Sequence, residues 1–152
     1  MRGRYWEDFV VGEAWETRGL TLTESMIVDF ALMWDPQHMH IDKPRAEAGP
    51  FGGLIASGFQ TLAASFRLFY DLGLMEDTNI VGPSLGEVSW PAPVRAGDTI
   101  RCRARVVESR QSASKPDRGI VRFAIETLNQ RGEIVCTFFP LGFIRTRAGA
   151  NG

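Results

Sequence analysis

The stretch Ser57-Gly-Phe-Gln-Thr-Leu-Ala-Ala-Ser-Phe-Arg-Leu-Phe-Tyr70 decides which fold this sequence can adopt. Its apolar residues recur three and four positions apart, which is the spacing of one face of an α-helix: Phe59, Leu62, Ala63, Phe66 and Tyr70. We predict a helix from Gly58 to Leu72, with Ser57 as its N-cap. Because apolar residues occupy most sides of this segment, we expect the helix to be buried in the body of the fold.

Beyond residue 78 the sequence takes on the two-residue period of β-strands. Between 100 and 106, apolar residues alternate with arginines, as in a strand that has one face in water. We predict further strands over 80–90, 121–127 and 134–144. Two helices followed by strands that are mostly joined by short turns indicate an α+β fold, in which an antiparallel sheet wraps the long helix.

The length of 152 residues is enough for one domain with a core of its own. We place this domain at residues 1–147 and expect a flexible, Gly-containing tail at 148–152. A sheet of this size has a free edge, which proteins usually cover. We therefore expect a homodimer or a dimer of dimers.

Composition argues against several classes of function. The formal net charge of −1 provides no basic field for nucleic acid. The sequence contains no apolar run long enough to span a membrane and no apolar signal segment, so we expect a cytoplasmic protein. Cys102 and Cys136 lie in apolar runs without the spacing of a metal site, so we expect two buried thiols and no bound metal.

Both histidines of the chain lie in the segment Asp35-Pro-Gln-His-Met-His40. Thr21-Leu-Thr-Glu24 fits a capping box, and the helix that it opens should end at Asp35 because Pro36 disfavours helical geometry in the residue before it. A loop should follow. A carboxylate and an imidazole this close can form an acid/base pair. The residues alone leave other roles open, since Asp35 could cap the loop and His40 could be an ordinary hydrogen-bonded loop residue.

The glycine-rich segment Phe51-Gly-Gly-Leu-Ile-Ala-Ser-Gly58 leads directly into the long helix. The N–H group of Gly58 would point at an anion, and the helix dipole would add about half a positive charge there. Without a Cβ, Gly58 would let a substrate come close, although it could also serve helix packing. Ser57 could be only an N-cap, and Gln37 could line the same pocket.

Taken together, these segments resemble the MaoC-like dehydratases, a family of hot-dog-fold proteins that includes the (R)-specific enoyl-CoA hydratases. The resemblance rests on Asp35-x4-His40, on Ala56-Ser-Gly58 before an apolar helix, and on the turn Pro93-Val-Arg-Ala-Gly-Asp98. It covers nearly the whole chain. It implies a single hot-dog domain, with the sheet wrapped around the central helix.

The resemblance also implies a lyase that reversibly hydrates a 2-enoyl-CoA thioester, which in reverse is dehydration of a 3-hydroxyacyl-CoA. No cofactor is expected apart from CoA as the carrier of the substrate. Asp35 would accept a proton from water, and His40 would orient that water and share in the proton transfer. The Gly58 N–H would hold the enolate oxygen, and Ser57 and Gln37 would contact the substrate.

The sequence departs from the family pattern Gly-Asp-x-Asn-Pro-x-His at three places, where Trp34, Gln37 and His38 replace the glycine, the asparagine and the proline. These changes bear on substrate fit and loop conformation. Two alternatives stay open, a hot-dog thioesterase and a non-catalytic subunit that binds acyl thioesters. Retention of both Asp35 and His40 favours the hydratase.

A polar, basic segment at 108–118 lies between two of the predicted strands. Arg110, Lys115 and Arg118 could contact the phosphates of CoA; a solvated hairpin loop is the alternative. Bulky side chains near the motif suggest a short acyl group, although any of them could belong to the core: Trp34, Phe51, Phe59 and Phe66.

Overall fold

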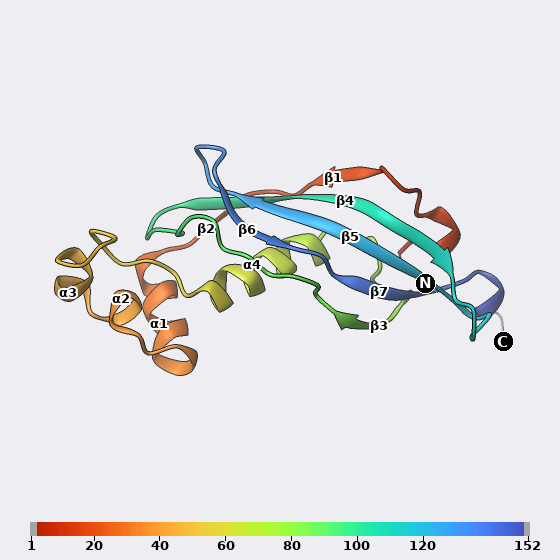
Figure 1. The fold of residues 1–152 in the computed structure, drawn as a ribbon, viewed down its shortest axis with the longest axis horizontal. Coiled ribbons are helices and arrows are strands. Elements are labelled where there is room, and N and C mark those ends of the chain that lie inside the picture. Colours follow the sequence, from red (N-terminus) through yellow and green to blue (C-terminus); the bar gives the residue numbers. More distant parts are fainter. Residues whose placement is uncertain (1–2, 151–152) are drawn as a thin grey trace.

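The computed structural model describes residues 3–150, which form one antiparallel sheet, one long helix and an arm of short helices (Figure 1). The helices are α1 (Glu24–Trp34), α2 (His38–Ile41), α3 (Lys43–Glu47) and α4 (Gly58–Tyr70), with 3-10 turns η1 (Trp6–Asp8) and η2 (Ala148–Ala150). The strands are β1 (Ala14–Glu16), β2 (Leu20–Thr21), β3 (Asn79–Ser84), β4 (Thr99–Gln111), β5 (Arg118–Leu128), β6 (Ile134–Phe138) and β7 (Leu141–Arg145). The predicted α+β architecture is confirmed.

The strands follow the order β1-β4-β5-β7-β3, with β2 also paired to β4 and β6 also paired to β5. All of these pairs are antiparallel. The hairpin of β4 and β5 forms the centre of the sheet and runs from the pair Arg101–Leu128 to the pair Gln111–Gly119. β3 ends the strand order, so its outer edge is open in the single chain.

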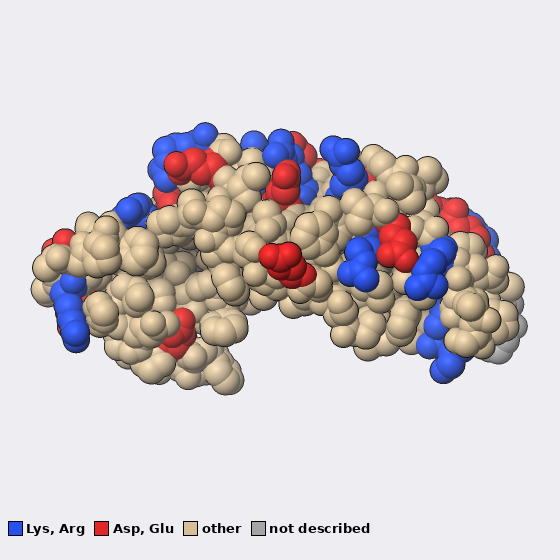
Figure 2. Space-filling view, viewed as in Figure 1, with Lys and Arg blue, Asp and Glu red and all other residues tan. Residues whose placement is uncertain are grey.

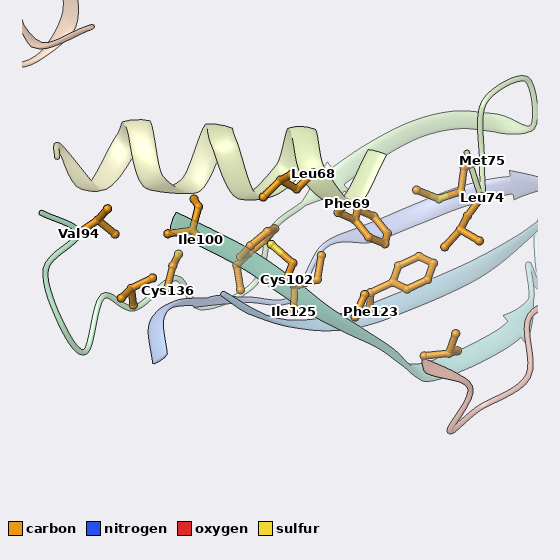
Figure 3. Packing of buried hydrophobic residues seen from close by; sticks show 14 of the residues in the cluster. Leu68, Phe69, Leu74, Met75, Val94, Ile100, Cys102, Phe123, Ile125 and Cys136 are labelled. Carbon is orange, nitrogen blue, oxygen red and sulfur yellow. The ribbon is translucent and has the colours of Figure 1, made fainter. Parts of the chain in front are cut away.

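The core lies between α4 and the concave face of the sheet (Figure 3). Leu68 and Phe69 point from the helix toward the sheet, and the ring of Phe69 meets that of Phe123 on β5 at a centroid distance of 4.9 Å. On β4, Ile100 and Cys102 face inward, as the alternating pattern predicts. Fully burying one such side chain contributes roughly 1.5–3 kcal/mol, so this contact holds α4 firmly on the sheet.

The expectation that α4 is buried on most sides is wrong. Its inner face carries polar residues, Gln60, Thr61 and Ser65, whose side chains hydrogen-bond to nearby carbonyl groups. The predicted apolar stripe faces outward instead, with Phe59 64% exposed and Phe66 40% exposed. The apolar period identified the helix correctly, but it did not identify the face that packs on the sheet.

The start of α1 also differs from the prediction. The N-cap is Thr23, whose hydroxyl accepts a hydrogen bond from Met26 N–H. Thr21 belongs to β2, and its hydroxyl lies 2.7 Å from that of Thr99. The competing strand pair therefore moves the start of the helix two residues along the chain. The predicted end holds, because Asp35 is the C-cap.

Two predicted strands are interrupted. The strand predicted over 80–90 ends at Ser84, and the chain bends through Gly86, which has φ +65°. The strand predicted over 134–144 is broken between β6 and β7, where Pro140 has no N–H for a ladder hydrogen bond. The Phe139 N–H is bound instead by the Leu85 carbonyl at 2.7 Å.

Helices α1 to α3 form an arm at one end of the sheet, beside the first turn of α4 (Figure 1). The segment after Asp35, predicted to be a loop, contains the single-turn helix α2. Within residues 3–150, none of the helices has the length and apolarity needed to cross a membrane. Of the predicted tail, η2 covers 148–150 and residues 151–152 lie outside the described part.

Candidate active site

Asp35 is fixed at the point where α1 gives way to the arm. Its N–H donates to the Ala31 carbonyl at 2.9 Å, and Pro36 prevents the helix from continuing. Both carboxylate oxygens accept hydrogen bonds, Oδ1 from the Gln37 amide at 2.8 Å and Oδ2 from the Ser57 hydroxyl at 2.6 Å. The carboxylate is thus held between its own loop and the N-cap of α4.

His40 lies on α2 and is 5% exposed. Its Nδ1 is 2.7 Å from the carbonyl oxygen of Ile55. Because a carbonyl only accepts, Nδ1 must carry the hydrogen. The other nitrogen, Nε2, lies 3.4 Å from Oδ2 of Asp35, so in the neutral ring a lone pair faces the carboxylate.

The hydrogen-bond donors around Asp35 keep it ionised. The Ser57 hydroxyl is the main cause that lowers the pKa of the Asp35 carboxyl, the Gln37 amide adds to this effect, and His40 contributes less. Partial burial acts in the opposite direction but does not prevail. Asp35 is therefore a carboxylate over the neutral pH range, as a proton acceptor must be.

Ser57 and Gly58 place the first turn of α4 beside this pair. The Ser57 hydroxyl accepts from Phe59 N–H at 3.2 Å, so its predicted N-cap geometry is present, and the same hydroxyl donates to Asp35. Gly58 is the first residue of α4, so its N–H belongs to the turn whose amides have no acceptor within the helix. The helix dipole adds a positive partial charge of roughly +0.5 at this end.

Asp35, Gln37, His40 and Gly58 line a pocket of about 440 Å³, whereas Ser57 is fully buried and does not line it. Its lining also includes Phe51, Phe59 and the segment 90–94. Apart from the Asp35–His40 pair and Gln37, its lining is largely apolar, which is typical of small-molecule sites.

The candidates named from the sequence divide into those that reach this pocket and those that do not. Phe51 and Phe59 line it, whereas Trp34 and Phe66 do not. His38, the other histidine, is half-buried on α2 and also does not line it. Trp90 lines the pocket and was not identified from the sequence, where an aromatic residue before Pro91-Ala-Pro93 was the available signal.

The three basic residues proposed for CoA phosphates lie far from this pocket in the single chain. The β4–β5 hairpin that carries them is at the opposite end of the sheet from the arm (Figure 1). Arg110 is paired with Glu108 and Arg118 with Asp117, each at 2.8 Å. Contact between this hairpin and CoA stays a prediction.

Among residues 3–150, histidine, cysteine, aspartate and glutamate side chains do not gather in any group of three or more that could hold a metal ion. Cys102 and Cys136 are both fully buried, as expected. Burial raises the pKa of the Cys136 thiol to about 12. It also raises the pKa of Cys102. Both sulfurs are therefore protonated and unreactive at neutral pH.

The fold belongs to a known class. Residues 8–127 match the MaoC-like domain, and this protein is a member of that family. A solved MaoC-like dehydratase from Rhodospirillum rubrum superposes with a TM-score of 0.88 at 36% identity, covering 95% of this chain and 99% of that one. A double hot-dog protein of Mycobacterium tuberculosis, Rv0216, is similar in fold, with a TM-score of 0.81 at 17% identity over 95% of this chain and 44% of that one. The hot-dog fold is thereby confirmed.

Two relatives show the range of the family. YdeM of Bacillus subtilis, an uncharacterized protein, is 33% identical over 125 residues, which are 82% of this chain and 87% of that protein. The 3-hydroxyacyl-thioester dehydratase Z of M. tuberculosis is 37% identical over 90 residues, which are 58% of this chain and 60% of that enzyme. The family thus includes enzymes that dehydrate acyl thioesters.

Proposed function

We propose that this MaoC-like protein is a lyase that reversibly hydrates a 2-enoyl-CoA thioester. The observation that carries the proposal is the 3.4 Å approach of His40 Nε2 to Asp35 Oδ2 in one pocket with the Gly58 N–H. A proton acceptor, a second group that can hold water and an anion-binding amide are the parts that hydration of an enoyl thioester requires.

Asp35 and His40 are suited to hold one water molecule between them. With Nδ1 donating to Ile55, the neutral form of the ring has its lone pair on Nε2, so in that form both Nε2 and the carboxylate can accept hydrogens from the same water. The water oxygen then adds to C3 of the substrate as Asp35 takes one of its protons. Asp35 then gives this proton to C2, so the net change is the addition of one water molecule across the double bond.

The helix N-terminus is suited to the charge that develops. As the C–O bond forms at C3, the electrons of the double bond move toward the thioester oxygen and give an enolate. The Gly58 N–H and the α4 dipole would stabilise this oxygen. Removing one such donor typically costs about 10²–10³ in rate, so the contribution of this amide is comparable to that of the acid/base pair.

Purified protein incubated with crotonyl-CoA tests the proposal. Hydration removes the enoyl absorbance without releasing thiol, whereas a thioesterase releases thiol. We expect loss of absorbance alone. Release of thiol would instead establish the hydrolytic alternative, and absence of both signals over a series of enoyl-CoA substrates would contradict the proposed activity.

Asp35→Asn gives the site-specific version of this test. It removes the proton acceptor while it keeps a side chain that can be hydrogen-bonded by Ser57, and kcat/KM should fall by about 10²–10⁴. Asp29→Asn is the matched control, because Asp29 is an exposed residue of the same helix, α1. Equal activity of the two variants would rule out Asp35 as the base.

A second copy of the chain is the proposed cover for the open side of the molecule. Among residues 3–150 no strand pairs with the outer edge of β3, and beside this edge runs a groove of about 480 Å³ whose lining contains no charged side chain. Phe66 and Tyr70 of α4 line this groove and are each about two-fifths exposed. Figure 2 shows the molecule hollowed between the arm and β3, with most of the visible charges over the sheet and at its far end.

Light scattering on the purified protein checks this proposal through its mass in solution. We expect a dimer or a multiple of it, and Phe66→Glu should shift the protein toward monomer because it places a charge in the groove. Val107→Glu changes an exposed side chain of β4 and is the control that should leave the mass unchanged. A monomeric wild-type protein at micromolar concentration would contradict a homodimer.

A further inference from the structure

The space that Gly58 leaves open is filled from within the protein. A Cβ built on Gly58 would come within 2.8 Å of Cε2 of Trp90 and within 3.1 Å of its Cδ2 and Nε1. These are ring atoms and cannot give way as the end of a flexible side chain can. The φ of Gly58 is not positive, so the backbone alone would accept alanine here. The requirement for glycine therefore comes from the indole.

Trp90 is held in this place by several contacts. Its Nε1–H donates to the carbonyl of Gly58 at 2.9 Å. Its ring meets that of Phe59 edge-on at a centroid distance of 6.4 Å. The preceding residue, Ser89, exchanges two backbone hydrogen bonds with Thr137 of β6, at 2.9 and 3.0 Å. The indole is thus tied to the sheet on one side and to the first turn of α4 on the other.

Trp90 lies beside Gly58 and lines the same pocket as Asp35 and His40. A group that reaches the Gly58 N–H has the indole as its neighbour. A fixed ring at this point restricts the orientations in which a planar thioester can lie, and a misplacement of about 1 Å can cost about 10²-fold in rate.

We propose that Trp90 is a positioning residue of this site, whose indole fixes the first turn of α4 and forms the wall against which the thioester lies at the Gly58 N–H. This inference rests on the proposed hydration of an enoyl thioester. It replaces the expectation that the missing Cβ of Gly58 makes room for the substrate, because Trp90 occupies that room.

A double-mutant cycle on crotonyl-CoA hydration tests the coupling of the two residues. Gly58→Ala should lower kcat/KM by about 10- to 100-fold because the new methyl group displaces the indole, and Trp90→Ala should have a similar effect. Adding Gly58→Ala to Trp90→Ala should change kcat/KM by less than about threefold. Circular dichroism and a melting curve for each variant identify losses that come from unfolding.

Additive losses in the double variant would overturn the inference, since they would mean that the substrate itself needs the space at Gly58. Wild-type activity of Trp90→Ala would also overturn it. If Trp90→Ala does not fold, Trp90→Phe keeps a smaller ring at this place but loses the five-membered ring with its Nε1–H; it should retain part of the activity, and Gly58→Ala should then cost less than in the wild type.

Tryptophan fluorescence supplies a readout that does not depend on turnover. Saturated butyryl-CoA should change the fluorescence of the wild-type protein and of Trp34→Phe, because Trp34 is 69% exposed and outside the pocket. The change should be lost in Trp90→Phe. If Trp90→Phe shows the same fluorescence change as the wild type, the role of Trp90 is contradicted but the proposed function is not. If the wild-type protein neither binds butyryl-CoA nor hydrates crotonyl-CoA, both the proposed function and the role of Trp90 are contradicted.

Discussion

Two hydrogen-bonded polar clusters lie against α4, one at its N-terminus and one under its middle. The first joins Asp35, His40 and Ser57. The second joins Ser65, Thr127 and Cys102, where Thr127 donates to Ser65 at 2.8 Å and the Cys102 sulfur lies 3.4 Å from the Thr127 hydroxyl. All three residues of the second cluster are fully buried, whereas the first opens on the 440 Å³ pocket.

The comparison shows what makes a buried polar group available for chemistry. In the second cluster each hydroxyl proton has an acceptor inside the core, since Thr127 donates to Ser65 and Ser65 donates to the Thr61 carbonyl. Burial keeps the Cys102 thiol neutral. In the first cluster the ionised Asp35 carboxylate and the His40 ring face a cavity. The second cluster therefore serves stability alone, whereas the first has hydrogen-bonding groups that a ligand in the pocket can reach.

The sharpest way to break this comparison is His40→Gln. The glutamine removes the Nε2 lone pair from the pocket, and we expect kcat/KM for crotonyl-CoA to fall by about 10²–10⁴. His38→Gln, two residues away and outside the pocket, should remain within about twofold of wild type. Equal loss in both variants would mean that α2 is needed only as a structural element.

Ser57→Ala should have a smaller effect with a characteristic pH dependence. Removing the strongest donor to Asp35 raises the pKa of its carboxyl, so the acidic limb of the kcat/KM profile moves to higher pH. Loss of the N-cap should also lower the free energy of unfolding by about 1 kcal/mol. A profile that stays in place would show that Ser57 acts on the helix only.

The lowered pKa of Asp35 in the wild-type protein also predicts how the free energy of unfolding depends on pH. Because the pKa of Asp35 is lowered in the folded protein, its contribution is present above the unfolded pKa of about 3.9 and is lost as pH falls through the folded value. The Asp35-related stability difference between wild type and Ser57→Ala should therefore shrink at acid pH. Denaturant unfolding at neutral and acid pH measures this difference.

Ser65→Ala addresses the second cluster and should give the opposite result. The Thr127 hydroxyl loses its acceptor in a fully buried place, and we expect the free energy of unfolding to fall by about 1–3 kcal/mol. The kcat/KM of the folded protein should not change. A loss of activity without a loss of stability would show that the two clusters are coupled through α4.

The smallest expected signal concerns the thiols. With the pKa of Cys136 raised to about 12 and that of Cys102 also raised, neither sulfur should react with a disulfide reagent at pH 8 in the native protein. Both should react after unfolding in denaturant. Rapid labelling of the folded protein would mean that this part of the core opens readily.

The sequence predicts well those features that depend on neighbours along the chain. The alternation in β4 and the three- and four-residue spacing in α4 are local patterns, and both elements are found where they were expected. The closeness of Asp35 and His40 also follows from their separation of five residues. These features need no knowledge of distant packing.

Features that depend on residues far apart in the sequence could not be predicted from local sequence patterns. Thr21 caps no helix because Thr99, far along the chain, draws it into a strand pair. The outward face of α4 is apolar because it borders an open groove, and helical spacing alone does not tell an open side from a packed one. Trp90 acts on a residue 32 positions away, so no local pattern marks it.

The Ile55 carbonyl that accepts a hydrogen bond from Nδ1 of His40 determines which ring nitrogen can exchange protons with the pocket. Ile55 is itself fixed, through its N–H to the Met39 carbonyl and through a β-bridge to Arg95. With Nδ1 held by this carbonyl, the imidazole cannot take up a proton at one nitrogen and release it from the other. Proton exchange is therefore restricted to Nε2. Every proton that His40 exchanges passes through Nε2, on the side of the ring that faces the Asp35 carboxylate and the pocket.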